Sequence, residues 1–210
     1  MFTDHSDPYE LFKEWFALAS AAEPIFPEAV TLATAAAGRH LVARPIARMV
    51  LMRGHDADGY VFYSNSHSRK GQELAANPHA ALLFYWRQPI SRQIRIEGVV
   101  SSTSEEESDA YFRGRPRQSQ IGAWASQQSA QLSSRQELEQ RMQQFEQQFA
   151  DQPVPRPPHW HGYRLRPQAY EFWQEQPARL HDRLVFTRES YGLSAGSSRA
   201  EPWQRSLLYP

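Results

Sequence analysis

The sequence predicts a mainly β fold, a barrel-like antiparallel sheet with helices at its periphery. Three observations lead to this expectation. At least six short apolar or alternating segments are separated by short turns. Helical patterns interrupt them only at intervals, whereas a parallel sheet needs a crossover after each strand. No glycine-rich phosphate loop or dinucleotide fingerprint is present, so a doubly wound sheet is not expected.

The N-terminal helix region comprises residues 1–27. Leu11, Trp15 and Leu18 share one helical face, which predicts a helix from about Tyr9 to Ala21. The strands that follow are recognised by alternation, by apolar runs and by the turns that bound them, such as Gly38-Arg39 and His55 to Gly59. They are expected at Ala29–Ala36, Arg44–Arg53, Tyr60–Asn65, Ala80–Trp86, Gln93–Val100, Gly162–Leu165, Ala169–Trp173 and Leu184–Arg188.

Three further helices are predicted between these strands. Ser68 is an N-cap candidate for a short helix to Ala76, which Asn77-Pro78 ends. Ser104 with Glu107 resembles a capping box and opens a helix to about Arg113. The third runs over residues 134–150, where apolar side chains recur at helical spacing.

Length and composition limit the class of protein. A chain of 210 residues and 24.2 kDa fits one domain, 1–210, with a loose C-terminal segment at 190–210. With 40% hydrophobic and 12% aromatic residues it is not a disordered chain. Its 23 basic and 23 acidic residues cancel, which argues against nucleic-acid or membrane binding by bulk charge.

The sequence lacks several common features. Without cysteine there are no disulfides and no thiolate metal sites. His159 and His161 have no nearby carboxylates in the sequence, so no metal is expected. No apolar run approaches the roughly 20 residues of a membrane span, and the acidic N-terminus is unlike a secretory signal. We therefore expect a cytoplasmic protein.

Two clusters of basic residues are candidate anion sites. Arg69-Lys70 stands at a helix start, where positive charge is unfavourable unless an anion binds there too. Arg113, Arg115 and Arg117 lie within five residues and precede Ser119, a group suited to a phosphate. Solvated side chains and an exposed basic loop are the alternatives, and the residues alone leave both open.

Two more groups of charged residues stand out. Arg44 and Arg48 share a strand face, while Arg53 is expected to point the other way unless a bulge intervenes. The segment Arg179-Leu180-His181-Asp182-Arg183 contains four ionisable groups in five positions. It is either a salt-bridge cluster or a group that orients a substrate.

Seven long stretches, in order along the chain, resemble the pyridoxine/pyridoxamine 5′-phosphate oxidases, an FMN-dependent family with a split-barrel fold. They are RPIARMVLMRG (Arg44–Gly54), VFYSNSHSRKGQEL (Val61–Leu74), NPHAALLFYW (Asn77–Trp86), RQIRIEG (Arg92–Gly98), SDAYFRGRPRQSQIGAWASQQS (Ser108–Ser129), PRPPHWHGYR (Pro155–Arg164) and EFWQEQPARLHDR (Glu171–Arg183). The resemblance runs from about Glu28 to the C-terminus and implies an FMN-binding split β-barrel.

The resemblance also implies site residues. FMN contacts fall on Arg48, Met49, Val50, Leu51, Met52, Arg53, Tyr63, Ser64, Arg69, Lys70, Gln93, Gln128, Ser129, Trp173 and Arg183. The substrate phosphate falls to Arg53, Tyr111, Arg115 and Ser119, and the reacting end of the pyridine ring to the catalytic pair Arg179 and His181. Some contacts come from a second subunit, because the family's sites lie at a homodimer interface.

The implied activity belongs to vitamin B6 metabolism. Pyridoxamine or pyridoxine 5′-phosphate would be oxidised by O2 to pyridoxal 5′-phosphate, with release of H2O2 and, from the amine, ammonia. A split-barrel flavoenzyme with another ring substrate, or a non-catalytic FMN or pyridoxal-phosphate binder, are the alternatives. The chain departs from the family at Arg53 (usually Lys), His161, Glu175-Gln176 and Leu207, and it lacks the basic N-terminal segment.

Overall fold

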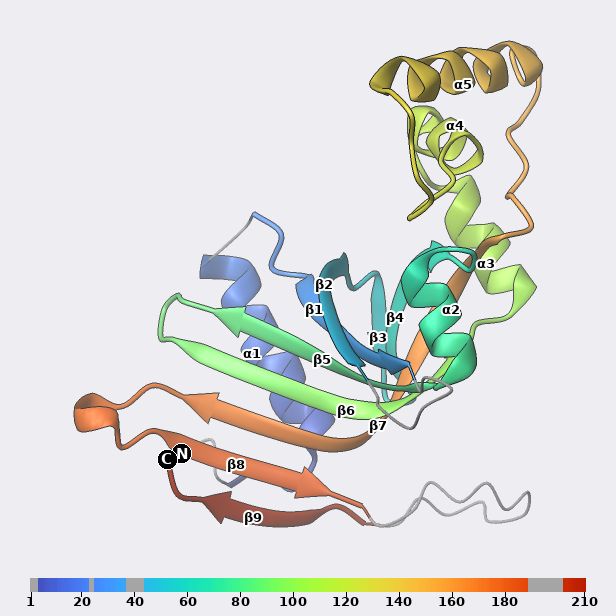
Figure 1. The fold of residues 1–210 in the computed structure, drawn as a ribbon. Coiled ribbons are helices and arrows are strands. Elements are labelled where there is room, and N and C mark those ends of the chain that lie inside the picture. Colours follow the sequence, from blue (N-terminus) through green and yellow to red (C-terminus); the bar gives the residue numbers. More distant parts are fainter. Residues whose placement is uncertain (1–3, 23–24, 37–43, 189–201) are drawn as a thin grey trace.

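A computed structural model describes residues 4–22, 25–36, 44–188 and 202–210 (Figure 1). Within these ranges nine strands form one antiparallel sheet, with helices around it. The elements are α1 (Pro8–Ala22), β1 (Ala29–Ala36), β2 (Arg44–Leu51), β3 (Gly54–Asp56), β4 (Gly59–Asn65), α2 (Arg69–Ala76), β5 (His79–Trp86), β6 (Arg92–Ser102), α3 (Glu105–Arg113), α4 (Arg117–Ala125), α5 (Arg135–Gln148), β7 (Trp160–Gln174), the 3₁₀ turn η2 (Pro177–Arg179), β8 (Asp182–Thr187) and β9 (Gln204–Leu208). The predicted fold class, mainly β with peripheral helices, is confirmed.

Strand β7 connects the two ends of the sheet. The order is β2-β1-β5-β6-β7-β4-β3, and in addition β8 pairs with β7 and β9 pairs with β8. The first residues of β7 pair with β4 and its last residues pair with β8, while β6 runs beside both halves. The register with β6 shifts at Glu97/Gly98. A Cβ on Gly98 would lie 2.0 Å from the carbonyl oxygen of Arg166, so only glycine fits there.

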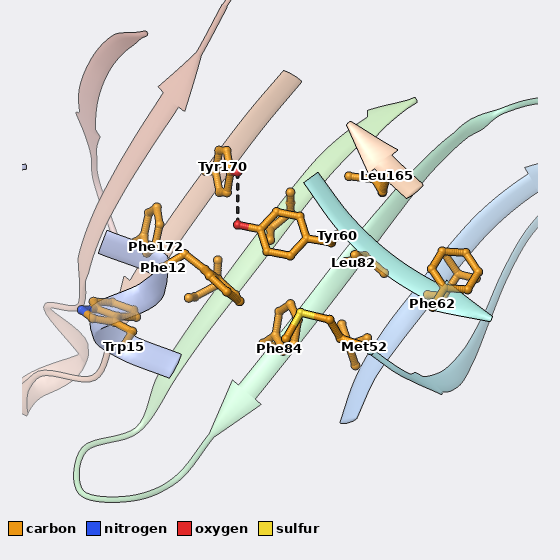
Figure 2. Packing of buried hydrophobic residues seen from close by; sticks show 14 of the residues in the cluster. Phe12, Trp15, Met52, Tyr60, Phe62, Leu82, Phe84, Leu165, Tyr170 and Phe172 are labelled. Carbon is orange, nitrogen blue, oxygen red and sulfur yellow. Dashed lines mark hydrogen bonds between the residues drawn. The ribbon is translucent and has the colours of Figure 1, made fainter. Parts of the chain in front are cut away.

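The core lies between the sheet and α1, and it is largely aromatic (Figure 2). Phe12 meets Tyr60 edge to face at 4.7 Å between ring centroids, and Trp15 meets Phe172 at 5.3 Å. The hydroxyls of Tyr60 and Tyr170 form a hydrogen bond of 3.2 Å, which satisfies both polar tips inside the core. Helix α1 is thus held by burial of a face that contains the predicted Leu11 and Trp15. The third predicted residue, Leu18, is 41% exposed, and Phe12 and Ala19 complete the buried face instead.

Helices α3, α4 and α5 form a helical arm beside the start of β7, away from β8 and β9 (Figure 1). A second apolar cluster holds it together, made of Phe112, Ile121, Phe149, Val154 and Trp160. Because Trp160 is also the first residue of β7, the arm and the sheet share this side chain. The arm is therefore anchored where β7 begins.

Most predicted element positions are confirmed, including the helix caps at Ser68 and Ser104. Four expectations were wrong. The segment after Pro116, treated as part of an arginine-rich loop, forms α4, and the two strands predicted at residues 162–173 are one continuous β7. The short strands β3 and β9 were not expected. The predicted turn at Gly38-Arg39 lies outside the described residues. The same holds for residues 190–201 of the predicted loose C-terminal segment.

Candidate active site

A cavity of about 500 Å³ lies between the β2 and β4 strands and the helical arm. Its walls combine main chain and side chains from both parts. They comprise Met49, Val50, Leu51, Arg53, Tyr63, Ser64, Asn65, Lys70, Tyr111, Arg115, Ser119, Gly122, Ala123, Ser126, Gln128 and Trp160. The volume falls in the range of small-molecule and cofactor pockets.

The cavity brings together eleven of the residues that the resemblance assigned to the flavin or the substrate. They are Met49, Val50, Leu51, Arg53, Tyr63, Ser64, Lys70, Tyr111, Arg115, Ser119 and Gln128. Met52 behaves differently, because its side chain is 4% exposed and packs in the main core. Arg48, Arg69, Gln93, Ser129, Trp173, Arg179, His181 and Arg183 do not line this cavity.

A buried carboxylate organises the start of α2. Glu73 is 6% exposed and accepts hydrogen bonds from Thr34 Oγ1 (2.6 Å), Arg48 Nη2 (2.7 Å) and Arg69 Nε (3.0 Å). Burial alone would raise the pKa of the Glu73 carboxyl, but the three hydrogen bonds outweigh it and lower that pKa below 4.5. Glu73 therefore stays ionised and fixes two arginines from different elements.

Lys70 is the cation of this cluster that reaches the cavity wall. Its Nζ donates to Gln128 Oε1 at 3.1 Å, and the same oxygen accepts from Ser64 Oγ at 3.2 Å. Burial, with the charge of Arg48 adding to it, lowers the pKa of the Lys70 ammonium from 10.5. An anion bound beside Lys70 would favour the charged ammonium and so oppose the lowering of its pKa by burial and by Arg48.

The three closely spaced arginines have different environments. Arg113 is exposed. Arg117, at the start of α4, donates to the main-chain carbonyls of Gln152 (3.2 Å) and Phe149, and so ties α4 to the end of α5. Only Arg115 lines the cavity. The structure therefore separates one candidate binding residue from a structural one.

The guanidinium of Arg115 is held by aromatic rings. Its Cζ lies 4.9 Å from the ring centroid of Trp160 and 5.6 Å from that of Phe112. Among the described residues its Nη1 is a buried donor without a hydrogen-bond partner. Burial lowers the pKa of Arg115, and the positive charge of Arg53 adds to this effect. Such a buried donor calls for an acceptor from outside the chain.

A stack of aromatic rings forms one wall of the cavity. Tyr63 lies 3.9 Å from Tyr111 and 5.0 Å from Trp160 between ring centroids, with nearly parallel planes. Burial raises the pKa of Tyr63 to about 12, so its hydroxyl remains a neutral donor. A Cβ on Gly162 would lie 2.8 Å from Tyr63 Cε1, so this glycine leaves the space that the ring needs.

Arg53 is located at the rim of the cavity. Its Nη1 pairs with Glu28 Oε1 at 3.2 Å, and its side chain is about one third exposed. Its main-chain N–H donates to the carbonyl of Val61 at 2.7 Å, which joins the end of β2 to β4. The side chain therefore pairs with Glu28 through Nη1 while it also lines the cavity.

A second group, centred on β6, β7 and β8, contains five of the remaining predicted residues: Gln93, Trp173, Arg179, His181 and Arg183. Arg48 and Arg69 lie at Glu73 as described above, and Ser129 is exposed with a positive φ of 73°. Gln93, Trp173 and Arg183 occupy one row, because Gln93 pairs with Trp173 and Trp173 pairs with Arg183. Arg183 Nη2 forms an ion pair with buried Glu171 at 2.7 Å. The pairing register of β6, β7 and β8 places these three residues side by side, because register determines which residues of neighbouring strands lie opposite one another.

The catalytic candidates lie beside this row. His181 is 4.6 Å from Trp173 between ring centroids, and its Nδ1 accepts a hydrogen bond from the main-chain N–H of Gln176 at 3.2 Å. Arg179 has a positive φ of 62° and its side chain is exposed. Both line a smaller surface pocket together with Trp173.

The cavity and the second group are far apart within one chain. Trp160 lines the cavity and Trp173 belongs to the row, yet both lie on β7, thirteen positions apart. At about 3.3 Å per residue this corresponds to roughly 40 Å of strand. No residue lines both pockets among the described parts of the chain.

Sequence reasoning missed the residues that hold the site together. Glu73 and Thr34 fix the arginines at α2, and Trp160 packs on Arg115. A glutamate four residues after Arg69 in a helix was a usable signal, because side chains at that spacing meet. Trp160 gave no comparable signal, since the sequence around a tryptophan in a proline-rich segment predicts only that the side chain is buried in a core.

The described residues lack two further features. They contain no group of three or more His, Asp or Glu side chains arranged to hold a metal ion. None of their helices is long and apolar enough to cross a membrane.

Comparison with known proteins identifies the family. A family model described as pyridoxamine 5′-phosphate oxidase matches residues 21–149, and one described as the pyridoxine 5′-phosphate oxidase C-terminal dimerisation region matches residues 160–210. The chain belongs to the pyridoxine/pyridoxamine 5′-phosphate oxidase family. It is an oxidoreductase.

Relatives bearing the family name match over nearly the whole chain. A pyridoxine/pyridoxamine 5′-phosphate oxidase of Bradyrhizobium sp. (strain ORS 278) is 49% identical, covering 100% of this chain and 91% of that protein. One from Paraburkholderia phytofirmans is 51% identical, with 97% and 89% covered. The sequence-based assignment to this family is confirmed.

Solved structures support the same fold. PhzG from Burkholderia lata 383, in complex with tetrahydrophenazine-1-carboxylic acid, is 33% identical with a TM-score of 0.86, covering 100% of this chain and 96% of that one. A pyridoxamine 5′-phosphate oxidase-related, FMN binding protein from Nostoc punctiforme has a TM-score of 0.72 at 14% identity, covering 97% and 98%. The predicted split-barrel fold is therefore confirmed.

Proposed function

We propose that the protein oxidises pyridoxamine 5′-phosphate or pyridoxine 5′-phosphate to pyridoxal 5′-phosphate, with FMN as cofactor and O2 as final electron acceptor. The amine reaction consumes one O2 and one water and releases ammonia and H2O2. The alcohol reaction consumes one O2 and releases H2O2. FMN, when bound, would supply the hydride acceptor for the C4′ carbon, and the residues of the chain would bind and orient the substrate.

One observation carries the substrate proposal. Arg115 lines the cavity together with Tyr111 and Ser119, and its Nη1 is buried without a hydrogen-bond partner among the described residues. A guanidinium with two neighbouring hydroxyls suits a phosphate, since it supplies charge-assisted and neutral donors together. The substrate phosphate would bind here, in agreement with the residues that the resemblance implies.

The cluster at α2 fits the phosphate of FMN. Three cations, Arg48, Arg69 and Lys70, surround the single carboxylate of Glu73, which leaves a net charge of two positive. A phosphate monoester carries about −1.5 to −2 at pH 7, so the charges match. Gln128, bonded to Lys70, would add a side-chain contact.

A homodimer would complete the site. Gln93, Trp173, Arg179, His181 and Arg183 belong to the second group, and β7 separates them from the cavity of their own chain. In a two-fold dimer the second group of one subunit would meet the cavity of the other. The match to a dimerisation region at residues 160–210 supports this arrangement. Light scattering should give about twice 24.2 kDa, and an active monomer would contradict the shared site.

Arg179 and His181 would bind the C4′ end of the substrate. With Nδ1 accepting from the Gln176 N–H, the neutral ring carries its proton on Nε2 and can donate from there. Arg179 supplies a second, permanently charged donor. Together they would orient the group that leaves as ammonia or becomes the aldehyde oxygen.

One assay tests the whole proposal. The purified protein should be yellow, and aerobic addition of pyridoxamine 5′-phosphate should produce pyridoxal 5′-phosphate and H2O2 in equal amounts. A colourless protein that binds no added FMN would disprove the flavin assignment. A yellow protein without turnover would disprove the oxidase.

A second candidate is oxidation of a different ring substrate that carries a carboxylate. It is favoured by the high structural similarity to PhzG, whose structure contains tetrahydrophenazine-1-carboxylic acid. A carboxylate would also pair with Arg115, because guanidinium binds both anions. The two candidates differ in one measurement, the preference for phosphorylated over unphosphorylated pyridoxamine, which only the first requires.

A further inference from the structure

Arg115 differs from the other cations of the cavity in what surrounds it. Arg53 pairs with Glu28, and Lys70 donates to Gln128. In the described part of the chain no carboxylate forms an ion pair with Arg115, and its Nη1 is buried without a partner. Its charge is therefore left for a ligand, and something other than an acid must hold the side chain in place.

Trp160 is placed to do this. Its ring centroid lies 4.9 Å from Arg115 Cζ, closer than that of Phe112 at 5.6 Å. The Trp160 ring is itself fixed, because it is 7% exposed, stacks on Tyr63 and meets Phe112 edge to face at 5.1 Å. Indole offers the strongest aromatic face for a cation.

An aromatic face and a carboxylate have different consequences for binding. A carboxylate would hold the guanidinium but cancel its charge, and an incoming phosphate would have to displace it. A ring attracts the cation through its quadrupole and leaves the net charge unchanged. It also restricts the many rotamers that a long arginine side chain can adopt.

We propose that Trp160 is a positioning residue that sets the preference for phosphorylated substrates by holding Arg115 in its binding orientation. The inference rests on the proposed function, because it takes the ligand of Arg115 to be a substrate phosphate. It assigns Trp160 no contact with the reacting carbon.

The main chain at Trp160 is held independently of its ring. Its carbonyl accepts from Arg156 Nη1 at 2.7 Å, and its N–H donates to the carbonyl of Pro157 at 3.0 Å. Substitution of the side chain therefore leaves these anchors in place. The chain also offers a matched control, Trp124, which packs in the same arm on Phe145 and Phe149 without contacting Arg115.

The test compares Trp160→Leu, Trp160→Phe and Trp124→Leu. Equilibrium dialysis of the flavin-loaded protein measures the affinity ratio between 4-deoxypyridoxine 5′-phosphate and 4-deoxypyridoxine, which lack the reacting group. Trp160→Leu should lower this ratio by about threefold to thirtyfold, the strength of a partly desolvated cation–π contact. Trp160→Phe keeps a ring and should lower it less, and Trp124→Leu should leave it unchanged.

Kinetics and a double variant complete the test. In the wild-type background Trp160→Leu should raise KM for pyridoxamine 5′-phosphate with little change in kcat. In an Arg115→Ala background the same substitution should have no further effect on the affinity ratio, because the side chain it positions is gone.

Two results would overturn the inference. One is an unchanged affinity ratio in Trp160→Leu, whether both analogues bind as before or both lose affinity equally, and the other is an equal effect of Trp124→Leu on the ratio. If Trp160→Leu does not fold, Trp160→Phe and its cycle with Arg115→Ala decide. The proposed function is tested separately, by turnover. If the wild-type protein binds the phosphorylated analogue but does not oxidise pyridoxamine 5′-phosphate, the proposed function fails while the dialysis test of Trp160 still applies.

Discussion

The start of α2 and the helical arm each hold cations at a proposed anion site, but they hold them in different ways. At α2 the buried carboxylate of Glu73 binds Arg48 and Arg69 directly. In the arm, Trp160 and Phe112 present their ring faces to Arg115. The first arrangement fixes arginines at the cost of part of their charge, and the second preserves the charge.

This difference matches two kinds of ligand. The α2 cluster is internally satisfied, so it keeps its geometry whether or not an anion is present. Arg115 has a buried donor without a partner among the described residues, so an acceptor on a bound ligand would complete its hydrogen bonding. The first suits a cofactor that stays bound through many turnovers, and the second a substrate that enters and leaves.

The largest expected effect concerns the carboxylate. Glu73→Ala should lower the free energy of unfolding by about 3–5 kcal/mol, because it leaves two arginine charges, one largely buried, without their partner. Urea denaturation measures it. Glu97→Ala removes a half-exposed partner of Arg95 and should cost at most about 1 kcal/mol. Equal losses of unfolding free energy in the two variants would contradict the prediction that Glu73 stabilises the fold more than an exposed glutamate does.

The next effect concerns the cofactor. Replacing Arg69 and Lys70 with Ala together should weaken FMN binding by roughly 1.5–3 kcal/mol per charge-assisted hydrogen bond lost. Quenching of flavin fluorescence measures the affinity. Riboflavin, which lacks the phosphate, is the control ligand and should lose little. If FMN affinity stays at the wild-type value, the flavin phosphate does not bind at α2.

The arm is tested by Arg115→Ala. It should raise KM for pyridoxamine 5′-phosphate, about tenfold for each 1.4 kcal/mol lost, and reduce the preference over unphosphorylated pyridoxamine. His181→Ala should keep that preference and lower kcat, and exposed Arg113→Ala should change neither. Values of kcat/KM for both substrates decide. An unaltered preference in Arg115→Ala would exclude the arm as the phosphate site.

The smallest expected effect is a pH dependence. Because the folded-state pKa of Glu73 is below 4.5, its stabilisation is fully present above that pH and is lost as the pH falls through the folded-state pKa. Glu73→Gln should therefore lose less stability than the wild type on acidification below pH 4.5. Urea midpoints at several acidic pH values measure this. Parallel curves would show that other carboxyls govern acid unfolding.

The sequence predicted the elements with strong local signals. Ser68 and Ser104 are caps followed by helical patterns, and Ile94 and Ile96 alternate with polar residues along β6. Helix α4 was missed because its apolar residues show almost no helical periodicity and arginines precede it. Continuous β7 was missed because the register shift opposite Gly98 lets the strand pass through Pro167.

The site divides in the same way. Family motifs pointed to the residues that line the cavity, since ligand-contacting side chains follow a recognisable pattern. The supporting residues could not be found from motifs, because Thr34 and Glu73 are 39 positions apart and meet only when α2 packs on β1 in the folded protein. Burial of an unpartnered donor on Arg115 is likewise a property of packing and has no local sequence signature.

The length of β7 has a genetic consequence. A dimer whose sites each combine the cavity of one subunit with the β7–β8 row of the other can be reconstituted from two defective copies. Cells that carry one allele with Arg115→Ala and another with His181→Ala would assemble mixed dimers in which one of two sites has neither lesion. With random pairing, about a quarter of all sites would be intact, so two impaired alleles would complement each other.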